Sequence, residues 1–190
     1  MNLIFGAVVA LLAVVAATAV IMNQAGPVIL EPAAPSPVSN AGLPENHPPI
    51  DALNRISTLL QMSQNDLQNA DLKIQLGNAY YDAGLYQEAS QAYEDGIALK
   101  PQGPDVQTDL ATCYHYLGQN DKALEILNKV LQQQPSFAPA LFNKGIVLQK
   151  GKNDAQGAVA AWEELLRTNP SYPQRSELEQ RIRQLKLAIK

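Results

Sequence analysis

The chain contains one cysteine and two histidines, residue types that commonly bind transition metals or take part in nucleophilic catalysis. Cys113 and His115 stand two positions apart on an expected helix, so their side chains point about 200° apart and cannot bind the same metal ion. His47 lies in a proline-rich segment. We therefore expect no catalytic triad, no metal cluster and no cofactor, and predict that the chain is not an enzyme. Cys113 is expected to be a small buried hydrophobic residue.

The charge of the chain narrows the class of partner. The sequence holds 14 Lys or Arg and 18 Asp or Glu, a formal net charge of −4. Such an acidic balance argues against nucleic acid as a partner and favours a basic or amphipathic protein segment, although it would also serve ordinary solubility. No pattern in the sequence points to a small-molecule substrate.

Small, aromatic and proline residues recur at a step of 34 or 35 positions, and this period predicts the elements that carry any site. The recurring sets are Gly77, Ala111 and Gly145; Tyr80, Tyr114 and Leu148; Ala89, Ala123 and Ala158; and Pro101, Pro135 and Pro170. Each period predicts a helical hairpin, because small residues permit two helices to cross closely and proline ends the second helix. The predicted repeats are 70–103, 104–137 and 138–172.

Three further residues follow the second small position of each repeat by four positions: Tyr93, Leu127 and Trp162. We expect them to fill the space between successive hairpins. The third repeat carries one extra residue, which we expect in the turn at 151–157 because an insertion in a loop costs little.

This pattern resembles the tetratricopeptide repeat. The resemblance implies an all-α solenoid of three hairpins. We add a flanking N-terminal helix at 50–63, with Ile50, Leu53, Ile56 and Leu60 on one stripe, and a capping helix at 174–190, with Leu178, Ile182, Leu185 and Ile189 on one stripe. The predicted repeat domain spans 50–190.

The first 49 residues have a different composition. Leu3–Met22 contains no charged residue, and as a helix of about 30 Å it would match the bilayer core. We predict a transmembrane anchor at 1–22, with a cleaved signal peptide ending at Ala19 as the alternative. Seven of the 13 prolines fall in 23–49, which predicts a flexible tether. No Lys or Arg precedes Arg55, and we expect the repeats outside a bacterial inner membrane, in the periplasm.

The resemblance also implies a concave groove lined by the first helix of each repeat. Transferred residue by residue, its lining is Ile74, Asn78, Tyr81 and Asp82; then Asp105, Thr108, Asp109, Thr112, His115 and Tyr116; then Phe142, Asn143, Ile146 and Gln149. Family members that bind acidic chaperone tails carry Lys and Arg at groove positions, whereas this chain has Ile74, Asp105 and Asp109 at or near them. The alternative is that the aromatic residues of this set pack between helices.

The whole plan resembles bacterial membrane-anchored tetratricopeptide proteins related to the repeat domain of cytochrome c maturation factors. The residues that carry this resemblance are the tether end 43–49 and the segments 142–146 and 160–166. It implies capture of an apocytochrome segment in the groove. We therefore predict a membrane-anchored module that binds a helical or extended segment of a client protein. The alternative is an assembly factor or accessory subunit of a membrane protein complex, which uses the small residues of the anchor as helix contacts.

Overall fold

The computed structural model describes residues 50–189, and every regular element in this range is helical. The elements are α2 (Ile50–Asn65), α3 (Ala70–Asp82), α4 (Tyr86–Leu99), α5 (Pro104–Tyr116), α6 (Asn120–Gln133), α7 (Ala138–Ile146), the π-helical turn η1 (Val147–Gly151), α8 (Ala155–Thr168) and α9 (Arg175–Ala188).

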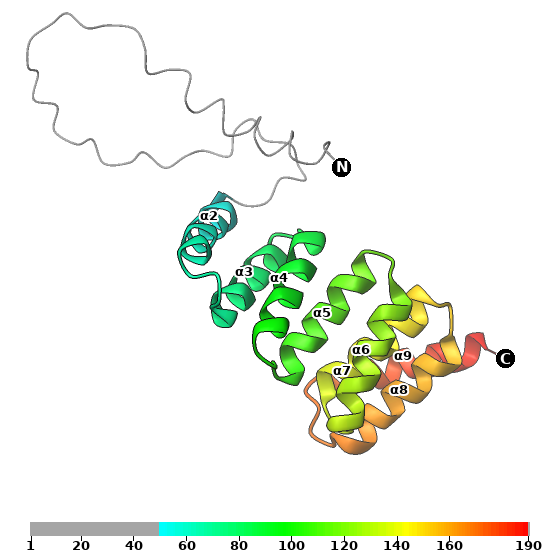
Figure 1. Ribbon diagram of the computed structural model, residues 1–190. Helices are drawn as coiled ribbons and strands as arrows, with labels where there is room; N and C mark the ends of the chain where they lie inside the picture. Colours follow the sequence, from blue (N-terminus) through cyan, green and yellow to red (C-terminus); the bar gives the residue numbers. More distant parts are fainter. Residues whose placement is uncertain (1–49, 190) are drawn as a thin grey trace, which may run out of the picture. The chain divides into compact units, whose positions relative to one another are not determined.

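The helices pack in sequence order as antiparallel hairpins (Figure 1). α3 packs on α4, α5 on α6 and α7 on α8, while α2 covers the first hairpin and α9 covers the last. The first helices α5 and α7 also contact each other directly; α3, α5 and α7 together are called here the row of first helices. The predicted all-α stack of helical hairpins is confirmed.

Local sequence signals set several helix ends. The Asn69 side chain accepts a hydrogen bond of 3.1 Å from the Leu72 amide at the start of α3, and Asp154 caps α8 through the Gly157 amide at 2.8 Å. Both satisfy amides that lack an intrahelical partner. The turns of the first two hairpins use Gly84 and Gly118 at φ 73° and 74°, a conformation that glycine adopts without strain.

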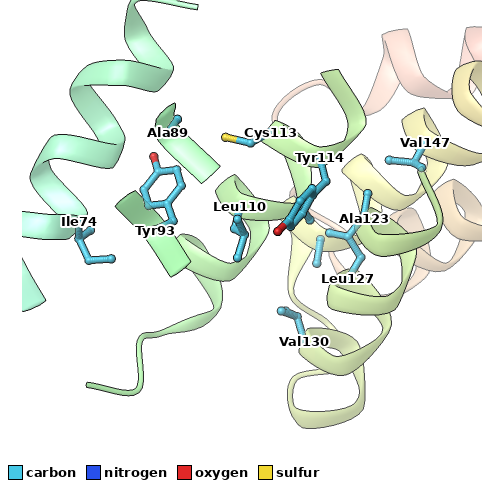
Figure 2. Packing of buried hydrophobic residues seen from close by; sticks show 12 residues of the cluster. Ile74, Ala89, Tyr93, Leu110, Cys113, Tyr114, Ala123, Leu127, Val130 and Val147 are labelled. Atoms are coloured by element: carbon cyan, nitrogen blue, oxygen red, sulfur yellow. The ribbon is translucent and has the colours of Figure 1, made fainter. Parts of the chain in front are cut away.

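The small residues of the repeat lie where two helices cross, as the period predicts. A Cβ atom built on Gly77 would lie 2.6 Å from the Tyr93 ring, and one built on Gly145 would lie 2.0 Å from Nε1 of Trp162. Tyr93 and Trp162 therefore cover the glycine of their own hairpin. Tyr93 also shares a buried cluster with Leu110 and Ala111 of the next hairpin, and Trp162 shares one with Leu178 of α9, as expected for residues that fill the space between successive elements. In the second hairpin, Ala111 and Leu127 stand at the equivalent positions, and both are fully buried in the cluster of Figure 2.

The two end helices bury narrower stripes than predicted. In α2 the buried residues are Ile56, Leu59 and Ser63, whereas Leu60 is exposed. In α9, Leu178 and Ile182 are buried, but Ile189 follows the helix and is exposed. Each end helix packs mainly on one helix, α2 on α3 and α9 on α8, so a stripe of two or three buried residues is enough for that contact.

The extra residue of the third repeat lies inside the helix, at η1, and not in the following loop. The Lys152 amide bonds to the Val147 carbonyl at 3.1 Å, five residues back, which is π-helical geometry. Beyond η1, the Asp154 amide reaches the Leu148 carbonyl six residues back, whereas the equivalent bond from Gln119 spans five residues. The positive φ of 53° at Asn153 then replaces the glycine of the other two turns.

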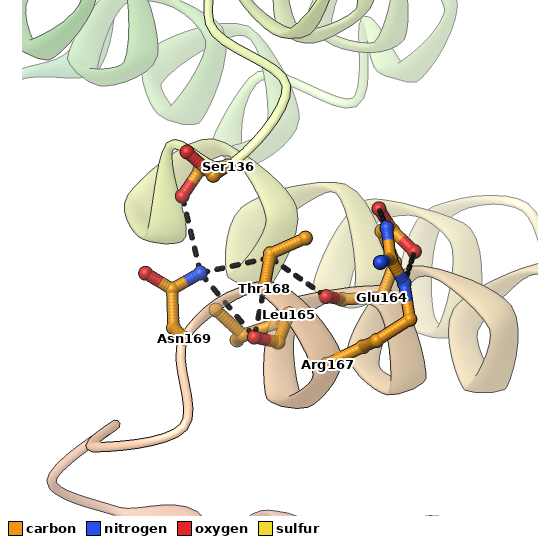
Figure 3. A network of polar contacts seen from close by, with 6 residues as sticks. All are labelled: Ser136, Glu164, Leu165, Arg167, Thr168 and Asn169. Carbon is orange, nitrogen blue, oxygen red and sulfur yellow. Dashed lines mark hydrogen bonds and ion pairs between the residues drawn. The ribbon is translucent and has the colours of Figure 1, made fainter.

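A polar network ties the end of α8 to the loop before α7 (Figure 3). Nδ2 of Asn169 donates a hydrogen bond of 3.1 Å to the Ser136 carbonyl, and Oγ1 of Thr168 donates to the Glu164 carbonyl at 2.7 Å. An ion pair between Arg167 and Glu164 lies beside them. The network fixes both ends of the third hairpin relative to each other.

The predicted membrane anchor and tether lie outside the described residues. Across 50–189, no helix combines the length and the apolar character that crossing a bilayer would require.

Candidate functional site

The first helices of the three hairpins enclose a cavity of about 350 Å³, called here the central cavity. Its walls are one residue of α3, four of α5 and five of α7 and η1. These residues are Tyr81, Asp109, Thr112, His115, Tyr116, Phe142, Asn143, Ile146, Val147 and Lys150. The row of first helices positions them because the hairpins stack side by side.

Aromatic rings form one wall of the central cavity. Tyr86, on α4, stacks on Tyr116 with ring centroids 4.1 Å apart and an interplanar angle of 8°. Tyr81 meets Tyr86 edge-on at 5.7 Å. Tyr116 remains 58% exposed, so this wall offers an aromatic face to solvent. Such faces bind apolar groups and cations.

A carboxylate lies beside this aromatic wall. Burial raises the pKa of Asp109 to about 6, and the nearby carboxylates of Asp105 and Asp82 add to the effect. No ion pair or side-chain hydrogen bond from a described residue reaches Asp109. Because no fully buried polar side-chain atom of the described residues lacks a partner, the oxygens of Asp109 face accessible space.

The opposite wall belongs to α7. Phe142 lies 6.4 Å from the Trp162 ring and 6.5 Å from the Tyr172 ring, so its position is fixed by the packing of the third hairpin. Nδ2 of Asn143 donates to Oγ1 of Thr112 at 3.1 Å, which links α7 to α5 across the floor. A second cavity of about 340 Å³ begins on the far side of Phe142, where Tyr172 and α9 contribute its walls.

A polar link lies at the turn end of the cavity. Nδ1 of His115 and Oδ1 of Asn120 are 2.7 Å apart, and Nδ2 of Asn120 donates to the Gly151 carbonyl at 3.2 Å. His115 is therefore held by the second and third hairpins together, and its ring edge borders the cavity.

The structure brings eight of the predicted groove residues together and places the rest elsewhere. Asn78 accepts a hydrogen bond of 2.8 Å from the Tyr93 hydroxyl, and Asp82 pairs with Arg55 of α2 at 3.3 Å. Asp105 is exposed in the first turn of α5. None of these three lines the central cavity.

Three more positions transferred from the family also lie outside the lining. Ile74 and Thr108 are buried in the helix packing. Gln149 accepts hydrogen bonds from the Arg181 guanidinium, at 3.1 Å from Nε. Ile74 and Gln149 thus contact neighbouring helices, whereas the Thr108 hydroxyl donates to the Pro104 carbonyl of its own helix at 2.7 Å.

The sequence reasoning missed three residues of the site: Tyr86, Val147 and Lys150. Tyr86 begins a second helix, yet its ring reaches the end of the next first helix, Tyr116. Val147 and Lys150 belong to η1, the π-helical turn that carries the extra residue of the third repeat. A signal was present in the uneven spacing of the third repeat.

Other chemistry is limited in the described part of the chain. Cys113 is fully buried, and burial raises its pKa to about 12, so its thiol stays protonated at neutral pH. Residues 50–189 contain no group of three His, Cys, Asp or Glu side chains placed to hold a metal ion.

Family models match this chain over its helical hairpins. Two models described as tetratricopeptide repeat cover residues 51–104 and 81–143. Among curated proteins, a TPR repeat-containing thioredoxin, TTL4, of Arabidopsis thaliana is 34% identical over 77 residues, which is 40% of this chain. The match spans only 11% of that relative's length.

Solved structures share the fold at low identity. The crystal structure of MamA has a TM-score of 0.60 and 17% identity, covering 71% of this chain and 86% of that chain. The first TPR domain of RPAP3, solved bound to the HSP90 peptide SRMEEVD, has a TM-score of 0.56 and 24% identity, covering 65% and 95%.

Proposed function

Because two tetratricopeptide-repeat models match residues 51–104 and 81–143, we propose that this chain binds a helical or extended segment of a client protein in the central cavity. Binding, and not catalysis, is the activity proposed. The observation that carries the proposal is the cavity itself, which all three first helices line with apolar, aromatic and polar groups. A segment laid into such a groove gains affinity from apolar anchors and selectivity from the polar groups around them.

The negative charge of the cavity lining favours a client segment that carries positive charge. The RPAP3 domain was solved with a peptide that ends Glu-Glu-Val-Asp. Here the half-buried charge of the lining is the Asp109 carboxylate, with Asp82 and Asp105 close enough to raise its pKa. A carboxylate-rich tail would meet like charge, so the client proposed is a basic or amphipathic segment.

Crosslinking in cells tests the proposal directly. A photoreactive amino acid placed at Tyr81 or Phe142 is expected to form an adduct with the client, because both side chains line the cavity. The matched control is Asn128, an exposed residue of the second helix α6. Adducts of the same mass from all three positions, or from Asn128 alone, would contradict a groove-bound client.

The location proposed is the periplasmic face of a bacterial inner membrane, with an apocytochrome as the first client to test. The apolar run Leu3–Met22 and the proline-rich segment 23–49 support a tethered module. The resemblance to cytochrome c maturation factors supports the choice of client.

Membrane retention is the measurable consequence of the anchor. Alkaline carbonate is expected to leave the chain in the membrane fraction, because an uncleaved span of 20 uncharged, mostly apolar residues holds it there. The intact mass of the purified chain should include Met1–Met22. A mature chain that begins at Val20, released by carbonate, would identify a cleaved signal peptide instead.

A further inference from the structure

In the central cavity a carboxylate lies beside aromatic rings, and the proposed function does not yet say which group of the client binds there. Asp109 stands on α5 near Tyr81 of α3, and Tyr116 lies about two turns further along the same face of α5 and lines the same cavity. Asp109 is half-buried, receives no ion pair from a described residue, and faces accessible space. A carboxylate in this state keeps its negative charge at a cost unless a cation compensates it.

We propose that Asp109, Tyr81 and Tyr116 form a subsite for one basic side chain, an arginine or a lysine, of the bound protein segment. The inference rests on the proposed function and names the chemistry of its main anchor. The carboxylate would accept charge-assisted hydrogen bonds from the cation, while the tyrosine rings would contact its planar or methylene part. An aromatic wall beside one carboxylate suits a cation better than it suits an anion or a purely apolar group.

The other charged groups around the cavity fit this assignment. Asp82 and Asp105 lie near enough to raise the Asp109 pKa, so they add to the negative potential that a cation would meet. Lys150 is the cationic residue of the lining, but it is exposed on η1, and an exposed lysine keeps its ammonium in water. His115 is held by Asn120 at the turn end.

The raised pKa of Asp109 favours a binding role for this carboxylate over a structural one. Its pKa is raised in the folded chain, so the folded state binds the proton more tightly than the unfolded state does. The stabilisation that this protonation gives is lost as the pH rises from the unfolded pKa toward 6. At neutral pH the ionised side chain therefore destabilises the folded state, as residues retained for binding often do.

Selection from a random peptide library displayed on phage tests the subsite with the full chain as bait. The wild type is expected to enrich peptides that carry Arg or Lys. Asp109→Asn should lose that preference and weaken binding of the selected peptide about tenfold or more, the loss expected for a charge-assisted hydrogen bond. A peptide with citrulline in place of arginine should bind the wild type as weakly as the arginine peptide binds Asp109→Asn. On the Asp109→Asn variant, the citrulline peptide should bind almost as well as the arginine peptide.

Matched variants separate the possible outcomes. Asp95→Asn removes the same charge from the second helix α4, keeps an oxygen for the Gln91 hydrogen bond, and should bind as wild type does. Asp109→Asn should melt no lower than wild type at neutral pH. Wild-type affinity for the selected peptide should fall as the pH drops below about 6, and the variant should lose that part of the change. A His115→Gln variant that keeps the fall shows that the imidazole is not its source.

Failure of the subsite and failure of the proposed function would look different. If peptides are enriched without any preference for Arg or Lys, and Phe142→Ala weakens them while Asp109→Asn does not, the subsite is wrong and the groove remains. If no peptide is enriched, or if neither variant changes the binding of an enriched peptide, the central cavity is not the binding site at all.

Discussion

Trp162→Ala is expected to lower the free energy of unfolding of the repeat domain by about 3–5 kcal/mol, the range typical of truncating a large aromatic side chain in a core. Trp162 is fully buried and lies in the core that joins the third hairpin to α9. Its Nε1 donates a hydrogen bond of 3.0 Å to the Phe142 carbonyl, and the Arg181 guanidinium lies 4.7 Å above its ring. Truncation leaves a cavity in contact with both.

Urea unfolding followed by far-ultraviolet circular dichroism measures this loss, since Trp162 is the only tryptophan and cannot report on its own removal. Leu187→Ala is the matched control, because Leu187 is 72% exposed on the adjacent helix α9. Equal losses from the two variants would mean that Trp162 does not hold the third hairpin together.

Gly145→Ala is expected to destabilise the domain by about 1–3 kcal/mol, although alanine ordinarily stabilises a helix by up to about 1 kcal/mol relative to glycine. The added methyl group would lie 2.0 Å from Nε1 of Trp162, and an indole ring packed on all sides cannot move aside. The helices α7 and α8 must then separate, which also displaces Phe142 at the cavity wall.

A double substitution provides the control for this prediction. The second hairpin has Ala111 where the third has Gly145, and Leu127 where the third has Trp162. In a Trp162→Leu background, adding Gly145→Ala should therefore be neutral or stabilising in the same urea titration. If Gly145→Ala lowers the free energy of unfolding as much in that background as beside the native Trp162, the glycine at position 145 is not required by the size of the side chain at position 162.

The sequence predicted the hairpins because their packing repeats. Ala89, Ala123 and Ala158 are all fully buried, as expected for residues that must let two helices approach, and the proline of each repeat follows a second helix. A periodic constraint of this kind is visible in one sequence, since every copy of the hairpin meets the same neighbours.

The candidate site was harder to predict because its residues meet different neighbours in each repeat. The repeat register predicts Asn78 and Asp82 at groove positions. In the structure, however, Asn78 accepts a hydrogen bond from Tyr93, and Asp82 forms an ion pair with Arg55 of α2. Ile74 fills the space beside Gly96, where a Cβ atom would lie 2.5 Å from its side chain. These pairings join residues of different helices, and no local sequence pattern predicts them.

The π-helical turn η1 implies that a groove of this kind can change its chemistry by insertion as well as by substitution. One added residue turns every later position of the helix by about 100° while the hairpin beyond it keeps its packing. In this chain Gln149 of this turn contacts Arg181, and Lys150 of the same turn lines the cavity. Single-residue gains and losses at the ends of first helices are thus a route by which such repeats could acquire new partners in evolution without rebuilding their cores.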